Sequence, residues 1–197
     1  MFAVLKTKLR AVARTRFGRD EKGVAAVEFA LLIPIILALF IGTIEMSQAI
    51  TIDRRVTQAT SATADLIART RSTTTNELDG IMEIVEQILR PYDPNLLSLT
   101  IANVIAAPDD ETDTTVCWAY QHNGGADTSL QPGSAYSLPP GIVEKGDSVL
   151  IAEAKYDYTG LLFEYFVEGA IELTEKFYLK PRLSLAIQFN GQDCLGS

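Results

Sequence analysis

The feature that most constrains this chain is an uninterrupted apolar run near its amino end. Residues 24–44 read VAAVEFALLIPIILALFIGTI, and Glu28 is the only ionisable side chain among them. At a rise of about 1.5 Å per residue, a helix over this run is about 31 Å long, which matches a hydrocarbon core of about 30 Å. The run therefore predicts a transmembrane helix.

The charges on the two sides of this run have opposite signs. The head before it has seven basic and two acidic side chains, a balance of +5. The part after Gly23 has 10 basic and 23 acidic side chains, a balance of −13. Basic flanks stay in the cytoplasm, so we expect the head inside and the acidic part outside. Repulsion from phosphates argues against a nucleic-acid partner. The basic residues of the head are Lys6, Lys8, Arg10, Arg14, Arg16, Arg19 and Lys22.

Two alternatives to a transmembrane helix stay open. One is a buried helix of a soluble protein, although an apolar run of this length beside a cationic flank is rare there. The second is a cleaved secretory signal, whose apolar region normally has about 7 to 15 residues and ends at a small-x-small site. The present run is longer, and Ser47-Gln48-Ala49 matches such a site weakly.

A glycine and a glutamate mark the start of the run. Gly23 lies at the junction of the basic head and the apolar run, and Glu28 is the fifth residue after it, followed by Phe29. A carboxylate near the membrane centre costs about 3 kcal/mol, so such a group usually has a function. Glu28 is nearer the cytoplasmic end, where snorkelling or protonation reduces that cost, so a passive glutamate remains an alternative.

The pattern Gly-x-x-x-x-Glu-Phe, after basic residues and before an apolar helix, resembles the type IV prepilin signal. Its continuation through Pro34 is similar to the TadE family of pseudopilins, from the Tad (Flp) pilus assembly system. The resemblance implies that a prepilin peptidase cuts after Gly23, which makes Val24 the new amino terminus. It also implies that Glu28 acts in processing or in packing against a neighbouring subunit. The implied partners are other pilins and pseudopilins and the pilus assembly platform proteins, in a bacterial inner membrane.

The chemistry of such a cut gives the carboxylate a partner. Glycine lets a protease hold extended backbone beside the membrane, because it removes side-chain bulk and weakens the helix. The cut creates an α-amino group that is mostly charged at neutral pH. Val24 and Glu28 are i and i+4 neighbours, so the amine can pair with Glu28 of its own chain or of another helix. A pair between chains would fix the axial register of a bundle of apolar helices.

Helical spacing continues beyond the apolar run to about Arg69. We expect one long helix whose outer half presents an apolar stripe to a globular domain, while its other face, rich in Thr, Ser and Gln, is solvated. A Ser/Thr run over residues 71–76 breaks it. A second helix follows, capped by Asn76 and ended before Pro91. The predicted stripes are Met46, Ala49, Ile50, Val56, Ala59, Thr63, Leu66 and Ile67 on the first helix, and Ile81, Ile84, Val85, Ile88 and Leu89 on the second.

After Pro94 the apolar residues alternate, which is typical of strands. Five strands are predicted, and the fifth follows Pro181. Their alternating residues are Leu97, Leu99, Ile101 and Ile105; Val116, Trp118 and Tyr120; Leu150, Ala152, Ala154, Tyr156 and Tyr158; Ile171, Leu173, Phe177 and Leu179; and Leu183, Leu185, Ile187 and Phe189.

These elements predict an α+β, pilin-like fold in which a long helix packs on an antiparallel sheet. We expect three parts: a basic cytoplasmic leader (1–23), a transmembrane helix (24–45) and a periplasmic α+β domain (46–197). Residues 156–163 and the later Pro181-Arg182 also loosely resemble the carboxy-terminal half of TadE-like proteins.

Cys117 and Cys194 are the only cysteines, and both lie in the expected periplasmic part. In an oxidising compartment they can form one disulfide. Closing a loop of about 78 residues would stabilise the fold by about 4.5 kcal/mol in the chain-entropy model, which is an upper value. Two separate buried thiols are the alternative.

The sequence offers no catalytic set and no cofactor motif. The single histidine, His122, precedes Asn-Gly-Gly and is expected in a turn, without a second histidine for a metal or a nucleophile partner. Residues 122–147, rich in glycine and proline, are expected to form a long surface loop.

The acidic run near residue 110 is the strongest candidate for a cation site, but it lacks the glycine and spacing of an EF-hand loop. A solvated acidic loop is expected instead. Its members are Asp109, Asp110, Glu111 and Asp113. We therefore expect neither an enzyme nor a metal site. The main alternative function is a membrane-anchored periplasmic binding or scaffolding protein without processing, and an anchored enzyme is a third.

Overall fold

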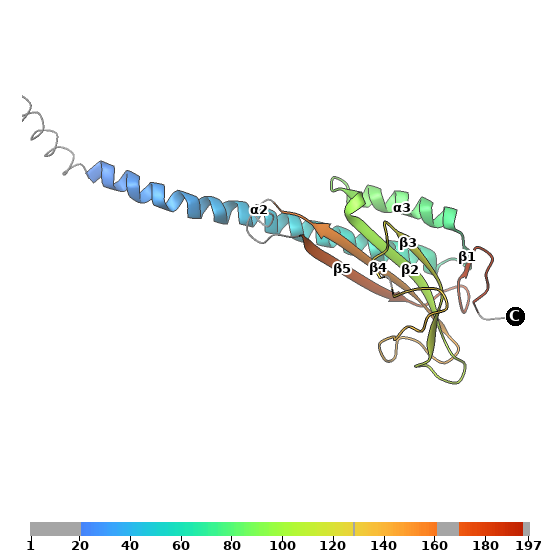
Figure 1. The fold of residues 1–197 in the computed structure, drawn as a ribbon. Coiled ribbons are helices and arrows are strands. Elements are labelled where there is room, and N and C mark those ends of the chain that lie inside the picture. Colours follow the sequence, from blue (N-terminus) through green and yellow to red (C-terminus); the bar gives the residue numbers. More distant parts are fainter. Residues whose placement is uncertain (1–20, 128, 161–169, 195–197) are drawn as a thin grey trace, which may run out of the picture. The chain divides into compact units, whose positions relative to one another are not determined.

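The computed structural model describes residues 21–127, 129–160 and 170–194, so most of the expected leader lies outside the described residues. Its element order confirms the α+β class (Figure 1). The chain divides into an amino-terminal unit, Met1–Met46, and a carboxy-terminal unit, Ser47–Ser197, which are described separately. The elements are α2 Glu21–Ala68, β1 Ser72–Thr73, α3 Thr75–Leu89, a 3-10 turn Pro94–Leu96, β2 Leu97–Ala106, β3 Thr114–His122, β4 Ser148–Tyr158, β5 Ile171–Leu179 and β6 Gln188–Phe189.

In the amino-terminal unit, α2 exposes apolar side chains around its whole circumference. Residues 23–40 are all exposed. Pro34 lies inside the helix, where its missing N–H removes one backbone hydrogen bond. By length and composition, α2 is the one described helix that can cross a membrane. It therefore fits a single-pass membrane protein.

In the carboxy-terminal unit, α2 buries one stripe at helical spacing. The predicted members Val56, Ala59, Thr63 and Ile67 are confirmed as buried, and Ile52 joins them. The predictions were wrong for Ile50 and Leu66, which are each 47% exposed, and for Met46, the last residue of the amino-terminal unit, which is 55% exposed. Ile50 and Leu66 lie on other sides of the helix, which the spacing of apolar letters did not separate from the stripe. The opposite, solvated face is confirmed by the exposed Ser47, Thr51, Arg54 and Gln58.

The start of α3 differs from the prediction. Thr74, not Asn76, is the N-cap, and it forms a capping box with Glu77. The Glu77 N–H donates to the Thr74 hydroxyl at 3.3 Å, and the Thr74 N–H donates to Glu77 Oε2 at 2.9 Å. This arrangement satisfies two helix-end donors, so it outcompetes a cap at Asn76.

The buried stripe of α3 is Leu78, Met82, Val85 and Leu89. Val85 and Leu89 were predicted correctly, and Ile81 and Ile88 are partly buried against the same core. Ile84 was assigned wrongly, because it is 54% exposed on the outer face of α3.

Arg55 of α2 closes the carboxyl end of α3. Its Nη1 donates to the carbonyls of Ile88 and Arg90, each at 2.7 Å. The guanidinium also lies over the Tyr92 ring, 5.8 Å from its centre. The last turn of α3 has no basic residue of its own. A charge on the neighbouring helix therefore satisfies carbonyls that α3 leaves without partners.

A four-stranded antiparallel sheet forms the centre of this unit, in the order β3-β2-β4-β5 (Figure 1). The first four predicted strands are confirmed. Both helices share one core with one face of this sheet. Thr57 of α2 donates to Glu175 of β5 at 2.9 Å, and Tyr120 of β3 donates to Asp79 of α3 at 2.6 Å. Hence α2 contacts the β5 side of the sheet and α3 contacts the β3 side.

The fifth predicted strand was wrong. Residues 182–186 form bends, and Leu183 and Leu185 are 54% and 60% exposed. Only Gln188–Phe189 forms a strand, β6, which pairs in parallel with β1. Other segments bind the backbone of this stretch. The Arg182 N–H donates to the Ala68 carbonyl, and the Leu185 carbonyl accepts from the Ser148 hydroxyl. Alternation alone did not reveal these competing partners.

The other face of the sheet is covered by the long connection between β3 and β4. The predicted loop of residues 122–147 is correct except at His122, which ends β3, since residues 123–147 contain no helix or strand where the structure describes them. However, Leu130 is fully buried and Val143 is 6% exposed. Leu130 belongs to a second apolar core with Val104 and Ile151 of the sheet. The connection is therefore a packed layer as well as a surface loop.

Replacing Arg55 with methionine should destabilise the carboxy-terminal unit by about 2 kcal/mol, because charge-assisted hydrogen bonds to two helix-end carbonyls are lost. Urea unfolding of the detergent-solubilised chain, followed by the fluorescence of Trp118, measures this, since Trp118 is the single tryptophan and is 1% exposed. Arg54→Met is the matched control and should change little. Equal stabilities of the two variants would contradict the role given to Arg55.

Candidate functional site

The residues of the expected processing site lie in the first turns of α2. Val24 is 59% and Phe29 is 61% exposed, so neither side chain packs into the described fold. A Cβ atom added at Gly23 would meet nothing within 4 Å. The described structure therefore gives no packing reason for glycine or for large apolar side chains at these positions.

The backbone at Gly23 is helical, whereas the cleavage hypothesis requires extended backbone at this residue. Gly23 lies inside α2, which begins at Glu21, and is not at a helix break. A protease that binds extended backbone would first have to unwind this turn. Glycine lowers the cost of unwinding by about 1 kcal/mol relative to alanine. The described conformation of Gly23 is helical, and under the cleavage hypothesis the glycine would make this turn easier to open.

Glu28 lies one helical turn beyond Val24, on the same side of α2. Its neighbours along the helix are exposed apolar side chains, and no ion pair joins it to another described residue. A carboxylate without a cation is costly in lipid. A charged amino group at position 24 would lie one turn from Glu28 on the same side of the helix.

Residues 23–65 match the family model described as TadE-like protein. This segment is TadE-like. The match begins at Gly23, includes Glu28 and Phe29, and ends within α2, so it confirms the resemblance over this region. Comparison with curated proteins found no match, and neither did comparison with solved structures. The match covers less than a quarter of the chain, and over this segment it favours a relation to Tad pilus proteins.

The looser resemblance in the carboxy-terminal half lies beyond this match and stays a prediction. Part of it, residues 161–163, also lies outside the described residues. The sheet and the long connection therefore have to be interpreted from their own geometry.

The structure pairs Cys117 with Cys194, whose Cα atoms lie 5.5 Å apart. A register shift in the β2–β3 ladder leaves Cys117 without a partner on β2. Cys117 and Trp118, although consecutive, therefore both pack on the core shared with the helices. Trp118 stacks on Phe189 with ring centres 5.0 Å apart, and its Nε1 donates to the Ile187 carbonyl at 2.6 Å. The disulfide and the tryptophan together tie the chain end to the sheet.

An open groove of about 630 Å³ lies beside this disulfide. One wall comes from the β2–β3 hairpin, with Asp113 and Thr115, and another from the chain end, with Gln192. Sequence reasoning missed the groove because four segments distant in the chain build it. Its further lining residues are Ile105, Ala106, Ala107, Pro108, Val116, Cys117, Pro132, Gly133, Gly146, Asp193 and Cys194.

A cluster of ionisable groups lies between the sheet and the long connection. Lys176 of β5 forms an ion pair with Glu153 of β4, lies 3.4 Å from Asp127 Oδ2, and donates to the Tyr136 hydroxyl at 2.9 Å. Asp127 and Tyr136 belong to the connection, and the Asp127 N–H donates to the Thr100 hydroxyl of β2. The cluster thus fastens the connection to the sheet.

The electrostatics of this cluster favour fixed charges over proton transfer. Burial alone would lower the pKa of Lys176, but the bonds to Glu153 and Tyr136 raise it above its usual range. Burial would raise the pKa of Asp127, but hydrogen bonds from Ser129 and the charge of Lys176 hold it below its usual value. Burial raises the pKa of Tyr136. Each group therefore keeps its ordinary protonation state near neutral pH, as in a structural ion pair.

The remaining sequence candidates are loop residues. His122 ends β3, and Asn123 and Gly124 follow with φ of 50° and 84°, which places the predicted turn there. In the acidic run, Asp110 accepts from the Thr112 hydroxyl and N–H, which stabilises a local turn. Among the described residues, no three His, Cys, Asp or Glu side chains gather as a metal site would require.

Asp127 gives a pH dependence that can be measured. Its folded pKa is depressed, so its stabilising contribution is present above about pH 4, where the unfolded carboxyl ionises, and is lost as the pH falls through the folded pKa. The free-energy gap between wild type and Asp127→Asn should therefore shrink from pH 6 to pH 3 in urea unfolding. Ser129→Ala should reduce this pH dependence in part. A gap that is constant with pH would contradict the assignment.

Proposed function

We propose that this chain is a TadE-like minor pilin, or pseudopilin, which acts in Tad (Flp) pilus assembly and is matured by a prepilin peptidase that cuts after Gly23. One observation supports this most: the TadE-like match begins at Gly23 and includes residues 23–40, which are exposed on all sides of the helix and have Glu28 as their single carboxylate. A buried soluble helix would not expose residues 23–40 in every direction.

In this proposal the cut changes the electrostatics of the helix end. It removes the basic leader and creates an α-amino group on Val24, one turn from Glu28. The carboxylate then has a cation within reach on its own helix or on a neighbour. A pair between neighbours offsets the cost of placing a carboxylate in lipid and is lost if the helices slide. The role is structural, and no catalytic step is assigned to the chain.

The proposed location is the bacterial inner membrane, with the leader in the cytoplasm and the carboxy-terminal unit in the periplasm. The charge asymmetry across the apolar run supports this orientation. The Cys117–Cys194 pair supports an oxidising compartment for the carboxy-terminal unit. The proposed partners are the prepilin peptidase, other pilins and pseudopilins, and the platform proteins of pilus assembly.

A membrane-anchored binding or scaffolding protein that is never cut is the second candidate. The groove beside the disulfide favours it, because an open concave surface of about 630 Å³ is large enough for a small ligand or a peptide segment. The two candidates differ in the fate of the leader, which the anchor would retain.

The intact mass of the membrane-extracted protein tests the proposal. Wild type should begin at Val24, whereas Gly23→Leu should accumulate as a precursor that begins at Met1, since a bulky helix-forming residue hinders both unwinding and binding to the peptidase. Gly18→Leu makes the same change inside the leader and should be cut normally. A wild-type chain that still begins at Met1, in cells with an active prepilin peptidase, would favour the uncut anchor.

A further inference from the structure

The outer face of α3 has features that the described fold does not use. Gly80 lies in the middle of this face, although glycine disfavours helix, and a Cβ there would meet nothing within 4 Å. Ile84, one turn later, is 54% exposed. Neither residue therefore contributes packing to the core of the unit. A small residue beside an exposed apolar one is what a closely approaching partner helix requires.

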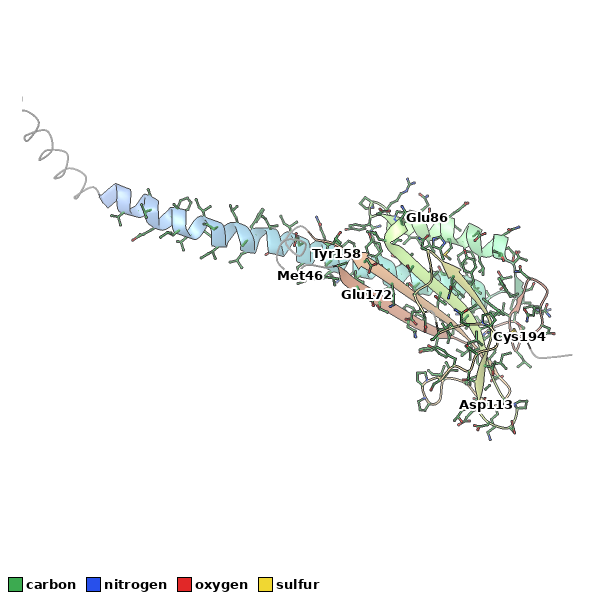
Figure 2. All side chains as sticks on the ribbon, in the orientation of Figure 1. Met46, Glu86, Asp113, Tyr158, Glu172 and Cys194 are labelled. Atoms are coloured by element: carbon green, nitrogen blue, oxygen red, sulfur yellow. A yellow bond between two sulfur atoms is a disulfide. The ribbon has the colours of Figure 1, made fainter. Side chains whose placement is uncertain are left out.

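The same helix has four acidic side chains and no basic one. Asp79 and Glu83 are i and i+4 neighbours, and Glu83 and Glu86 are i and i+3 neighbours, so like charges lie side by side. No ion pair joins Glu83 or Glu86 to another described residue. Figure 2 labels Glu86 on α3. A cation from another molecule would relieve this repulsion.

The outward face of α2 in the carboxy-terminal unit has the complementary character. Its side chains at helical spacing are small or polar apart from the exposed Ile50, and Arg54 is its single exposed cation. Arg54 forms no ion pair with another described residue, whereas the guanidinium of Arg55 is taken up by the end of α3. The face consists of the exposed Ser47, Thr51, Arg54 and Gln58 and the half-buried Ser61.

The two faces also lie within about one helical turn of each other along the unit. Arg55 contacts the carbonyls of Ile88 and Arg90, and α2 and α3 form a hairpin, so their residues run past each other in opposite directions (Figure 1). Arg54 is therefore level with the carboxyl end of α3, one turn beyond Glu86. Counting back along the hairpin places Ser61 level with Glu83, about one turn from Gly80. A second copy displaced sideways, and by about one helical turn along the axis, would bring Ser61 beside Gly80 and Arg54 beside Glu86.

We propose that the outer face of α3 in one copy binds the outward face of α2 in a second copy of this chain, through Gly80 and Ile84 and through Arg54 with Glu83 and Glu86. The contact uses two different faces, so it repeats from copy to copy instead of closing into a symmetric dimer. This inference rests on the proposed function, since an open series of copies is useful to a subunit of a filament.

A crosslinking experiment with two tagged full-length copies in membranes tests the contact. One copy has Gln58→Cys and the other Gln87→Cys, and a short bis-maleimide joins them, because both native cysteines are held in the disulfide. We expect a higher yield of crosslink between a Gln58→Cys copy and a Gln87→Cys copy than between two Gln58→Cys copies. Gly80→Leu in the second copy should abolish it, while Trp118 fluorescence stays that of the folded unit.

Charge exchange gives the sharper readout. Arg54→Glu in the first copy, or Glu83→Arg with Glu86→Arg in the second, should each lower the crosslink about fivefold, as expected for an exposed ion pair turned repulsive. Combining the changed copies should restore it. No crosslink, or a crosslink that ignores these changes, would overturn the contact. Intact mass of the same samples separates the hypotheses: cut chains without a crosslink disprove the contact alone, and uncut chains disprove the proposed function.

Discussion

An apolar helix with a lone carboxylate near its start imposes the main requirement on this molecule. Its side chains face outward in every direction over residues 23–40, so water cannot be their surroundings in the functional state. Lipid or other apolar helices must cover them. Both coverings leave Glu28 in a medium where a charge without a counterion is costly. The proposed membrane insertion, new amino terminus and helix association would each answer part of this one requirement.

The carboxy-terminal unit meets a different requirement, which is to hold distant segments of chain in one body. Its strongest links join elements that the sequence separates widely. Arg55 of α2 fixes the end of α3, Cys117 of β3 is bonded to Cys194, and Lys176 of β5 holds the connection through Asp127. The apolar cores supply most of the stability, while these links determine which segments lie together.

Regular periodicity in the sequence was enough to predict the apolar helix, the stripe through Val56 and Ile67, and four strands, because one repeated burial pattern defines each. Predictions went wrong where a side chain's own surroundings decide the outcome. Ile50 and Ile84 are apolar but lie on exposed helix faces. The alternation from Leu183 onward does not form a full strand because other segments bind its backbone.

The features of the candidate site also fall into two groups, those that the sequence predicts and those that only the fold brings together. Gly23 and Glu28 could be found from the sequence, because a charged residue within an apolar run is recognised without any knowledge of the fold. The groove beside Cys194 and the cluster around Lys176 could not, because each needs several segments in three dimensions. The helical backbone at Gly23 was also missed, since helix extending back to Glu21 outweighs the weak local preference of glycine.

The central claim is that Glu28 is retained in the apolar helix because cleavage and helix packing provide it with a cation. Glu28→Gln keeps the shape and removes the charge, so it tests this claim most directly, with Glu111→Gln in an exposed loop as the control. We expect Glu28→Gln to reduce the fraction of chains that begin at Val24, the amount co-isolated with other pilus subunits, or both. If intact mass and co-isolation are both unchanged from wild type, the account is wrong.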